Sequence, residues 1–290
     1  MEYINAQPIM KWPGGKRRVL PELRKYIPEN YNSYVEPFIG GGAFYFDLQP
    51  PQSFISDINA ELINLYRVIR DEAPTLIEEL SNGKYLNSLE VFLDIRSLDR
   101  DIENYATLSD VEKAARTLYL NRTCFNGLYR VNLKNQFNAH FGHYENPRIV
   151  DKENIEAISE LFTTHKTSIR HESYADALER VEGSQNFIYL DPPYIPLTET
   201  ASFVSYSKDR FGLAQQEDVR DRALKLDESG NYLLISNSDT PLTRELYKDF
   251  VIVPINVKRS IGASSTTRIA VGEVLILGKT LAQELDIQTP

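Results

Sequence analysis

The stretch VEPFIGGGAF, residues 35–44, joins a strand-like run to a helix-like run through three consecutive glycines. Glycines at such a turn let a ligand approach the backbone closely, and the start of the following helix can polarise that ligand. Asp57 closes the next strand-like run, where a carboxylate can accept hydrogen bonds from both hydroxyls of a ribose. The stretch therefore predicts an α/β fold with a nucleoside site at its glycine turn.

The glycine turn is poorly suited to a pyrophosphate. It lacks the G-x-G-x-x-G spacing, and Glu36 lies just before it, where a carboxylate would repel phosphate but could hold an ammonium group. The pattern favours a nucleoside with a cationic amino-acid tail, namely S-adenosylmethionine, over NAD. An NAD-dependent oxidoreductase would need a pyrophosphate loop that this chain does not supply.

Strand-like runs alternate with helical patterns along the chain. The first four end in acidic or polar residues, as expected where parallel strands deliver side chains to a ligand-binding edge. The last two are joined by a short Gly- and Ser-rich connection, so we expect an antiparallel hairpin at the edge of a seven-stranded Rossmann-like sheet. The runs are SYVEPF (33–38), SFISDI (53–58), TSIRHES (167–173), NFIYLD (186–191), NYLLISN (231–237), FVIVPINV (250–257) and GEVLILG (272–278).

A long interval after the second run interrupts this alternation. It begins in DINAELINLYRVIRDE (57–72), where helical spacing predicts one apolar face made by Ile58, Leu62, Leu65, Tyr66 and Ile69. Farther on, Ser109 and Glu112 form a capping-box pattern ahead of a second helix. The polar, aromatic-rich stretch that follows has little apolar periodicity, and long loops of this kind are often functional.

We therefore expect an inserted, mostly helical domain over residues 70–155 that carries an irregular loop or hairpin. Residues 1–69 and 156–290 are expected to form the sheet-containing domain, which would bind S-adenosylmethionine.

The composition is typical of a globular protein, with 42% apolar and 25% charged residues and a net charge of −9. No segment approaches the roughly 18 uninterrupted apolar residues that a membrane span needs. The first residues lack the pattern of a signal peptide, so we expect a cytoplasmic protein. We also expect a monomer without membrane contact. Cys124 is the single cysteine, and the four histidines show no metal-ligand spacing, so we expect no metal site.

Basic residues gather in three stretches with few acids, despite the negative net charge. If the stretches converge, they form a cationic face suited to phosphate contact, although charge alone leaves open three unrelated solvated segments. The first stretch holds Lys11, Lys16, Arg17, Arg18, Arg24 and Lys25, the second Arg122, Arg130, Lys134 and Arg148, and the third Lys258, Arg259 and Arg268.

Two further motifs combine stiff turns with chemically useful side chains. In KWPGGK (11–16), the turn at Pro13 brings Lys16 back beside Trp12, where the pair could pack on a methionine chain and bind its carboxylate. Taken alone, the motif fits structural roles better, with the tryptophan in the core and the lysine solvated. In NFIYLDPPYIPL (186–197), two prolines end a buried strand and leave a rigid tip that carries Asp191 and Tyr194.

The rigid tip suits methyl transfer to an exocyclic amino group. Such a nitrogen is a poor nucleophile because its lone pair is conjugated with the base. Asp191 and the carbonyl of Pro192 could accept from its two N–H groups and free that lone pair. Tyr194 would offer a face on which an extracted base stacks.

In their order, these motifs resemble the Dam family of DNA adenine methyltransferases. The similarity runs through KWPGGK, EPFIGGGAF, SDINAELINLY, YLNRTCFNGLYRVN, DPPYIPL and NVKRSI followed by TTR. The resemblance implies transfer of a methyl group from S-adenosylmethionine to N6 of a flipped-out adenine in double-stranded DNA, within GATC. It also implies that residues 70–155 are the target-recognition domain.

The resemblance also implies roles for single residues. The catalytic set is Asp191, Pro192 and Tyr194. The donor would be bound by Trp12, Lys16, Glu36, Phe38, Gly40, Gly42, Asp57 and Asp191. DNA would be contacted by Lys11, Phe125, Asn126, Leu128, Arg130, Asn132, His140 and His143. Lys11 would read a guanine edge and Arg130 a base pair, while Phe125 would insert into the stack at the flipped site.

Two positions depart from the family pattern. His140 and His143 stand in FNAHFGHY, where FNVPFGRY is typical of enzymes that act on GATC. Histidine can donate to a base edge or a phosphate, so a different adenine-containing site stays open as an alternative. Cytosine-N4 methylation uses the same chemistry but usually has serine in place of Asp191. RNA or protein amide methylation usually begins the tetrapeptide with asparagine, and a DNA-binding protein without activity would not need this acid.

Overall fold

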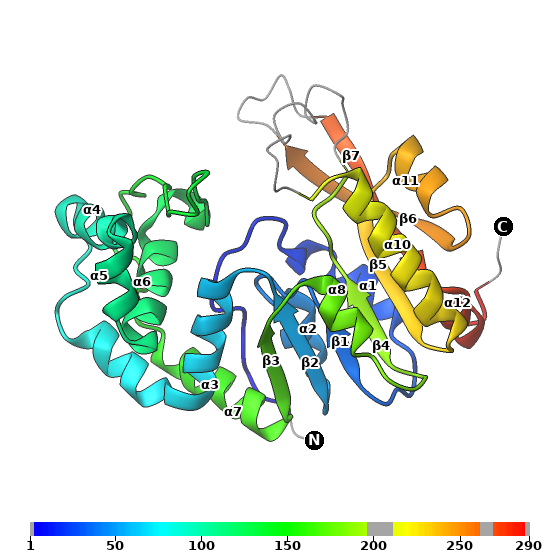
Figure 1. The fold of residues 1–290 in the computed structure, drawn as a ribbon, viewed down its shortest axis with the longest axis horizontal. Helices are drawn as coiled ribbons and strands as arrows, with labels where there is room; N and C mark the ends of the chain where they lie inside the picture. The colour runs from blue at the N-terminus through cyan, green and yellow to red at the C-terminus, as the bar shows by residue number, and fades with distance from the viewer. Residues whose placement is uncertain (1–2, 196–210, 262–268, 288–290) are drawn as a thin grey trace. The chain divides into compact units, whose positions relative to one another are not determined.

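The computed structural model describes residues 3–195, 211–261 and 269–287, with the backbone alone for 256–261 and 269–271. Its strands form a seven-stranded mixed sheet in the order β3-β2-β1-β4-β5-β7-β6 (Figure 1). All seven predicted runs are strands, and β6 and β7 form the predicted antiparallel hairpin at the sheet edge. The bounds are β1 Tyr34–Glu36, β2 Ser53–Asp57, β3 Thr167–His171, β4 Phe187–Leu190, β5 Tyr232–Ser238, β6 Val251–Ile261 and β7 Ile269–Leu277.

The chain divides into two compact units, described separately below. The first unit is formed by residues 1–17, 39–51 and 56–171, and the second by residues 18–38, 52–55 and 172–290. The expected recognition domain at residues 70–155 lies wholly within the first unit. Its boundaries stay a prediction.

The first unit is built mainly from helices. Helix α3 packs against α6 and α7, and its kink at Glu72 lies just ahead of Pro74. Four of the five residues predicted for its apolar face are buried, but Ile58 is 71% exposed because the helix begins only at Ala60, capped by Asn59. The helices are α2 Ala43–Leu48, α3 Ala60–Ser81, α4 Leu89–Ser97, α5 Ile102–Thr107, α6 Asp110–Thr123 and α7 Lys152–Thr164.

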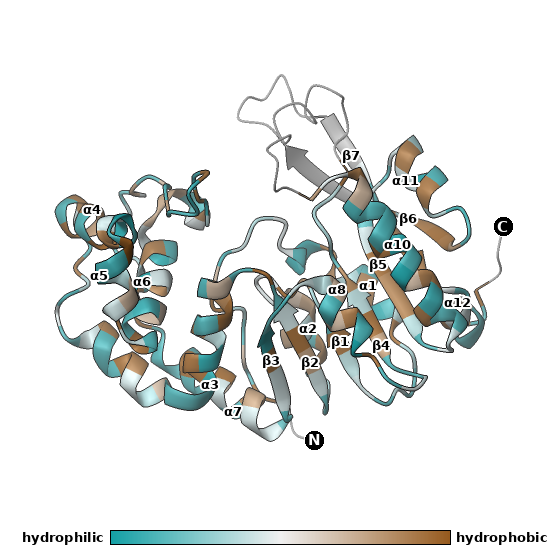
Figure 2. Ribbon diagram, viewed as in Figure 1, coloured by the Kyte–Doolittle hydropathy of each residue, from teal (hydrophilic) through white to brown (hydrophobic). Residues whose placement is uncertain are grey.

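The second unit contains the parallel strands β1, β4 and β5, and the antiparallel strand β7. Figure 2 shows β4 and β5 as predominantly hydrophobic ribbons, as expected for strands buried on both faces. Ile188 and Leu190 pack with residues of β5, β7 and α10 in one core. Among the described residues of this unit, the α-helices are α1 Leu20–Leu23, α8 Tyr174–Glu179, α10 Leu213–Glu228, α11 Pro241–Leu246 and α12 Lys279–Glu284.

Strand register places three acids of the second unit at one edge of the sheet. Glu36 ends β1, and Asp191 follows Leu190 at the end of the parallel strand β4. Glu273 lies opposite Ser238, the last residue of β5, because β7 runs antiparallel to β5. These three acids therefore lie at the end of the sheet where the parallel strands have their carboxyl ends.

The predicted capping box of α6 is present. The Ser109 hydroxyl accepts from the amide of Glu112 at 3.2 Å, and the Glu112 carboxylate accepts from the Ser109 amide at 2.9 Å. The pKa of Glu112 is lowered first by the hydrogen bond from the Ser109 amide and then by a second bond, of 2.9 Å, that the Ser109 hydroxyl donates to the same carboxylate. The capping box thus gives acceptors to the amides of Ser109 and Glu112, which have no partner within the helix.

We predict that Ser109→Ala lowers the free energy of unfolding by about 1 kcal/mol at neutral pH, because the amide of Glu112 loses its acceptor. Urea denaturation measures the difference. Ser81→Ala is the matched control, because the Ser81 hydroxyl is exposed and donates back to the Ile77 carbonyl within α3. That control is expected to change stability by less than about 0.5 kcal/mol.

The contribution of the capping box also depends on pH. Since folding lowers the pKa of Glu112, its contribution is complete above the unfolded pKa and is lost as pH falls through the folded pKa. The difference between Ser109→Ala and the wild type should therefore shrink in acid. A difference that grows below pH about 4 would contradict this origin.

Candidate functional site

The glycine turn of the first unit is tied to the acid that closes β2. Gly40 and Gly42 have φ of +46° and +68°, the left-handed region that favours glycine. The amide of Gly40 donates to the Asp57 carboxylate at 3.0 Å, and the amide of Asn59 donates to the same group at 2.9 Å. Burial raises the pKa of Asp57, against the pull of these amides. The two ends of the predicted nucleoside site thus meet.

Trp12 packs directly on this glycine turn. A Cβ on Gly40 would lie 2.7 Å from Cδ1 of Trp12, so a side chain at residue 40 would displace the indole. The amide of Gly15 donates to the Trp12 carbonyl at 3.1 Å, which confirms the turn predicted for KWPGGK. The ring of Tyr129 stacks on Trp12 with centroids 5.0 Å apart. The KWPGGK motif and the glycine turn, which are distant in sequence, therefore pack into one surface.

Lys16 differs from the expectation for a cationic face. Its side chain is buried, and the ammonium donates to the Gly14 carbonyl at 2.8 Å. Burial removes Lys16 from any exposed basic surface. The hydrogen bond to Gly14 holds the lysine within the KWPGGK turn, and its role in binding the donor stays a prediction.

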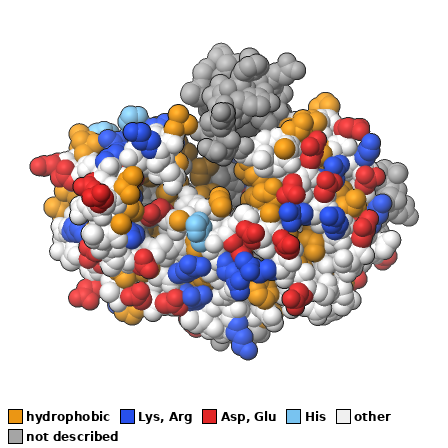
Figure 3. Space-filling view, in the orientation of Figure 1, with side chains coloured by type: hydrophobic (Ala, Val, Ile, Leu, Met, Phe, Trp, Pro, Cys, Tyr) orange, Lys and Arg blue, Asp and Glu red, His pale blue; other side chains and the backbone are white. Residues whose placement is uncertain are grey.

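The loop after α6 presents most of the predicted DNA contacts to solvent. Two isolated bridges, Cys124 with Phe141 and Val131 with Phe137, fold it into an irregular hairpin. Figure 3 shows basic and histidine side chains gathered over the corresponding part of the first unit. The exposed residues are Lys11, Phe125, Asn126, Leu128, Arg130, His140 and His143.

Asn132 occupies a different position from the other predicted contacts. It is half-buried, and its side-chain oxygen accepts from the amides of Lys134 and Gln136 at 2.9 and 3.0 Å. Its side-chain nitrogen donates to Gln136 as well. In the described structure, Asn132 shapes the hairpin turn.

Arg130 and Lys11 are oriented by neighbours. The guanidinium of Arg130 donates to the side-chain and backbone oxygens of Asn138 at 2.7 and 2.8 Å. The Lys11 ammonium lies 5.7 Å from the ring centroid of Tyr144. Asn121 binds both the amide and carbonyl of Lys11 and donates to the Gly127 carbonyl at 3.0 Å. These contacts place Lys11 beside the loop, so the first and second basic stretches meet at this point, as expected for a cationic face.

Other basic residues of the second stretch are paired with acids. Arg122 and Arg148 lie 3.7 and 3.0 Å from the Asp151 carboxylate, and Arg148 also contacts Glu153. Burial lowers the pKa of Arg122. The third stretch cannot be assigned to this surface, since the side chains of Lys258 and Arg259 and all of Arg268 lie outside the described residues.

The second unit holds the rigid tip after β4. Asp191 and Tyr194 are half-buried, Pro192 is buried, and the Tyr194 hydroxyl donates to Glu273 at 2.9 Å. At the end of β1, the buried Glu36 carboxylate accepts from the Tyr34 hydroxyl at 2.7 Å. Phe38 stacks on Tyr174 with centroids 5.3 Å apart.

Three residues that sequence reasoning missed support these sites. Tyr129 stacks on Trp12, Asn121 joins Lys11 to Gly127, and Glu273 holds Tyr194. A lone acid inside the apolar run GEVLILG was a signal for Glu273, because carboxylates are rarely buried without a partner. Asn121 near the end of a helix was a weaker signal, since asparagine disfavours helix interiors.

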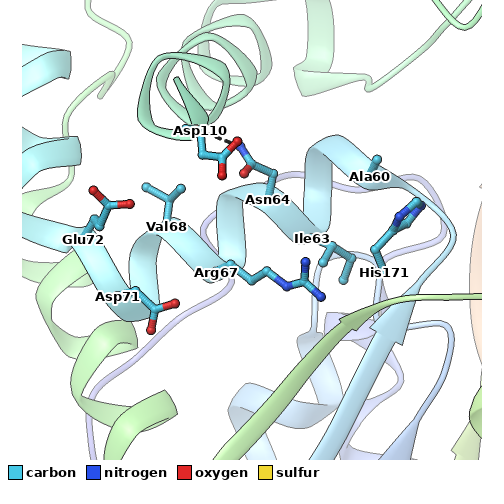
Figure 4. Close-up of a pocket in the computed structure, with 9 residues that line it drawn as sticks. All are labelled: Ala60, Ile63, Asn64, Arg67, Val68, Asp71, Glu72, Asp110 and His171. Carbon is cyan, nitrogen blue, oxygen red and sulfur yellow. Dashed lines mark hydrogen bonds between the residues drawn. The ribbon is translucent and has the colours of Figure 1, made fainter. Parts of the chain in front are cut away.

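A pocket of about 330 Å³ opens on the flank of α3, also in the first unit (Figure 4). Its residues are Ala60, Ile63, Asn64, Arg67, Val68, Asp71, Glu72, Asp110 and His171. Asn64 donates to the Asp110 carbonyl at 2.8 Å across it. None of the predicted catalytic, donor or DNA-binding residues lines this pocket, so it is separate from the sites described above.

Within the described residues, no group of three or more His, Cys, Asp or Glu side chains could hold a metal ion. The helices in the described part of the chain are also too short or too polar to cross a membrane.

Comparison with known proteins gives matches over nearly the whole chain. A family model described as D12 class N6 adenine-specific DNA methyltransferase matches residues 12–261. The type II methyltransferase M1.LlaDCHI of Lactococcus lactis subsp. cremoris is 47% identical over 273 residues, covering 94% of this chain and 95% of that protein. The DNA adenine methylase of Escherichia coli strain K12 is 34% identical over 273 residues, covering 93% and 94%.

A third relative also matches over most of its length. The type II methyltransferase M.MjaIII of Methanocaldococcus jannaschii is 36% identical over 282 residues, covering 91% of this chain and 96% of that protein. The residues that the family model matches, 12–261, include the glycine turn, the loop after α6 and the tip after β4.

We predict that Gly40→Ala shifts the fluorescence emission of Trp12 to longer wavelength. The new methyl group would force the indole off the turn and away from Tyr129. Because Trp12 is the only tryptophan, tryptophan emission from the folded variant reports on the surroundings of this side chain.

Gly83→Ala is the matched control for backbone strain. Gly83 has φ of +86°, but a Cβ there would meet nothing within 4 Å. This control should lose stability without a change in emission. An unchanged spectrum for folded Gly40→Ala would show that the indole does not depend on the glycine.

Proposed function

The chain belongs to the D12 class of N6 adenine-specific DNA methyltransferases, and we propose that it methylates N6 of an adenine flipped out of duplex DNA. S-adenosylmethionine is the proposed donor and GATC the proposed site. The observation that carries the proposal is the Asp-Pro-Pro-Tyr tip, which follows a buried parallel strand and is fixed by hydrogen bonds from Tyr194 and its neighbours.

The tip supplies the acceptor half of the proposed reaction. The Asp191 carboxylate and the Pro192 carbonyl accept from the two N–H groups of the adenine amine and so localise its lone pair on nitrogen. Neither proline can form a ladder hydrogen bond through its nitrogen, and their rings restrict the backbone that aims these oxygens. The Tyr194 ring offers a stacking surface for a base outside the duplex.

The first unit supplies residues suited to the donor. Asp57 is proposed to accept from the ribose, while the surface of Trp12 and the glycine turn binds the rest of the nucleoside. Lys16 is proposed to pair with the carboxylate of the methionine tail, and in the second unit Glu36 is proposed to pair with its ammonium. When bound, S-adenosylmethionine supplies an electrophilic methyl group on its sulfonium.

DNA recognition is assigned to the exposed loop after α6. Phe125 and Leu128 are large apolar side chains with 58% and 41% exposure, which suits insertion among bases. Arg130 carries a planar guanidinium that its bonds to Asn138 orient, which suits reading of a base edge. His140 and His143 are the proposed determinants of any departure from GATC, and a different adenine-containing site is the alternative that they favour.

The direct test is to expose unmethylated DNA to the purified protein with S-adenosylmethionine and sequence the modified bases. Methyladenine confined to GATC supports the full proposal. Methyladenine at another sequence supports the chemistry and assigns a different specificity, while N4-methylcytosine or unmodified DNA contradicts it.

We predict that Asp191→Asn lowers the single-turnover rate of methyl transfer at least about 100-fold, because a neutral amide oxygen accepts more weakly than a carboxylate and does not stabilise the positive charge that develops on the adenine amine. Donor and DNA affinity are measured alongside the rate by equilibrium binding. Asp249→Ala is the control for loss of an acid in the same unit, since Asp249 is exposed after α11. Wild-type turnover by folded Asp191→Asn would exclude the proposed role.

We predict that Arg130→Ala relaxes discrimination at one base pair of the site by about 1–3 kcal/mol. The measurement compares kcat/KM on the preferred site with kcat/KM on each singly substituted site. Lys134→Ala is the matched control, because Lys134 is an exposed cation on the turn of the same hairpin. It should weaken binding equally on all sites and reduce the salt slope, as a phosphate contact does. An equal loss on all sites for Arg130→Ala would make it a phosphate contact too.

A further inference from the structure

The backbone immediately after the two prolines is held by side chains of neighbouring elements. Gln216 of α10 donates to the Pro193 carbonyl at 2.6 Å. The amide of Ile195 donates to the side-chain oxygen of Asn237 at 3.2 Å, and its carbonyl accepts from the Ser238 hydroxyl at 2.7 Å. Side chains thus take over the pairing of this backbone where the ladder of β4 stops.

These supporting side chains are themselves connected and buried. Asn237 donates to the side-chain oxygen of Gln216 at 3.3 Å, so α10 and the end of β5 act on the segment together. Gln216, Asn237 and Ser238 are all at most 4% exposed. Buried polar groups that satisfy one another in this way restrict the number of arrangements that the segment can adopt.

Glu273 holds the ring of the same segment. Its carboxylate accepts from the Tyr194 hydroxyl at 2.9 Å, and the residue is 1% exposed within β7. The hydroxyl lies at the far end of the ring from the backbone, so this bond and the bonds to Pro193 and Ile195 fix Tyr194 at both ends. The register of β7 with β5 places Glu273 opposite Ser238, beside the rest of the support.

A carboxylate at this position is costly for folding. Leu275 and Leu277 in the same strand are fully buried, and an apolar residue at position 273 would avoid the desolvation of a charge. A residue with this cost suits a role in fixing geometry.

We infer that Glu273 is a positioning residue for methyl transfer: through the Tyr194 hydroxyl it orients the ring on which the flipped adenine stacks. Gln216, Asn237 and Ser238 set the backbone from which that ring projects. This inference rests on the proposed function, because it assigns a purpose to Tyr194 only if a base leaves the duplex.

The test compares Glu273→Leu with Glu273→Gln in the full chain. Leucine fills similar space without an acceptor, whereas the glutamine oxygen can still accept from Tyr194. We expect Glu273→Leu to lower the single-turnover rate about tenfold, with donor and DNA affinity within about twofold of wild type. Glu273→Gln should restore most of the rate.

A fluorescent base gives a readout that a merely structural role would not move. In DNA with 2-aminopurine in place of the target adenine, stacking on an oriented ring quenches the flipped base. Glu273→Leu should flip the base but leave it brighter than wild type does, and Tyr194→Phe should give the same change. The double variant, Glu273→Leu with Tyr194→Phe, should lose no more rate than either single variant, because both substitutions remove the same hydrogen bond.

Tyr247→Phe is the matched control for loss of a tyrosine hydroxyl. Tyr247 is buried in the same unit, and its hydroxyl has no hydrogen-bond partner among the described residues. This variant should keep the wild-type rate and fluorescence. If Glu273→Leu fails to fold, Tyr194→Phe carries the test, since it removes only one oxygen atom.

Three outcomes would overturn the inference alone while wild-type protein methylates adenine. They are a wild-type rate for folded Glu273→Leu or for Tyr194→Phe, an equal loss for Glu273→Gln and Glu273→Leu, and unchanged 2-aminopurine fluorescence in the variants. A wild-type chain that methylates no adenine overturns the proposed function, and this inference with it.

Discussion

The two prolines at the end of β4 impose the constraint on which the acceptor half of the site depends. Pro192 and Pro193 have no amide proton, so the ladder that β4 forms with β1 and β5 cannot continue through them. The backbone beyond must be paired by other groups, and Gln216 and Asn237 provide that pairing. A local break in the sheet thereby becomes a fixed platform for Asp191 and Tyr194.

In the first unit, close packing on glycine has a comparable effect. The positive φ of Gly40 and the indole of Trp12 leave no room for a Cβ, and the Asp57 carboxylate holds the amide of the same glycine. The ring of Tyr129, from the loop after α6, stacks on Trp12. Residues proposed for the donor and residues beside the proposed DNA contacts thus share one packed cluster within this unit, so a substitution in either group can disturb the other.

The distribution of charge is compatible with the proposed DNA-binding surface on an acidic chain. Acids neutralise Arg122 and Arg148, and burial withdraws Lys16, so these three do not add to an exposed basic face. Lys11 and Arg130 remain exposed on the first unit, where aromatic and amide neighbours orient them. Attraction of DNA phosphates to the proposed surface would depend on these local charges more than on the net charge of −9.

The sequence by itself determined the features that depend on residues close together in the chain. All seven strands, the edge hairpin and the Ser109 cap follow from local patterns, and the motif order indicated the family. The prediction that Ile58 belongs to the apolar face of α3 was wrong, because Asn59 caps the helix and Ile58 lies before its first turn. Only the tertiary structure decided that Lys16 is buried and that Glu273 supports Tyr194. Such contacts join residues far apart in the chain, and no local spacing encodes which buried partners meet.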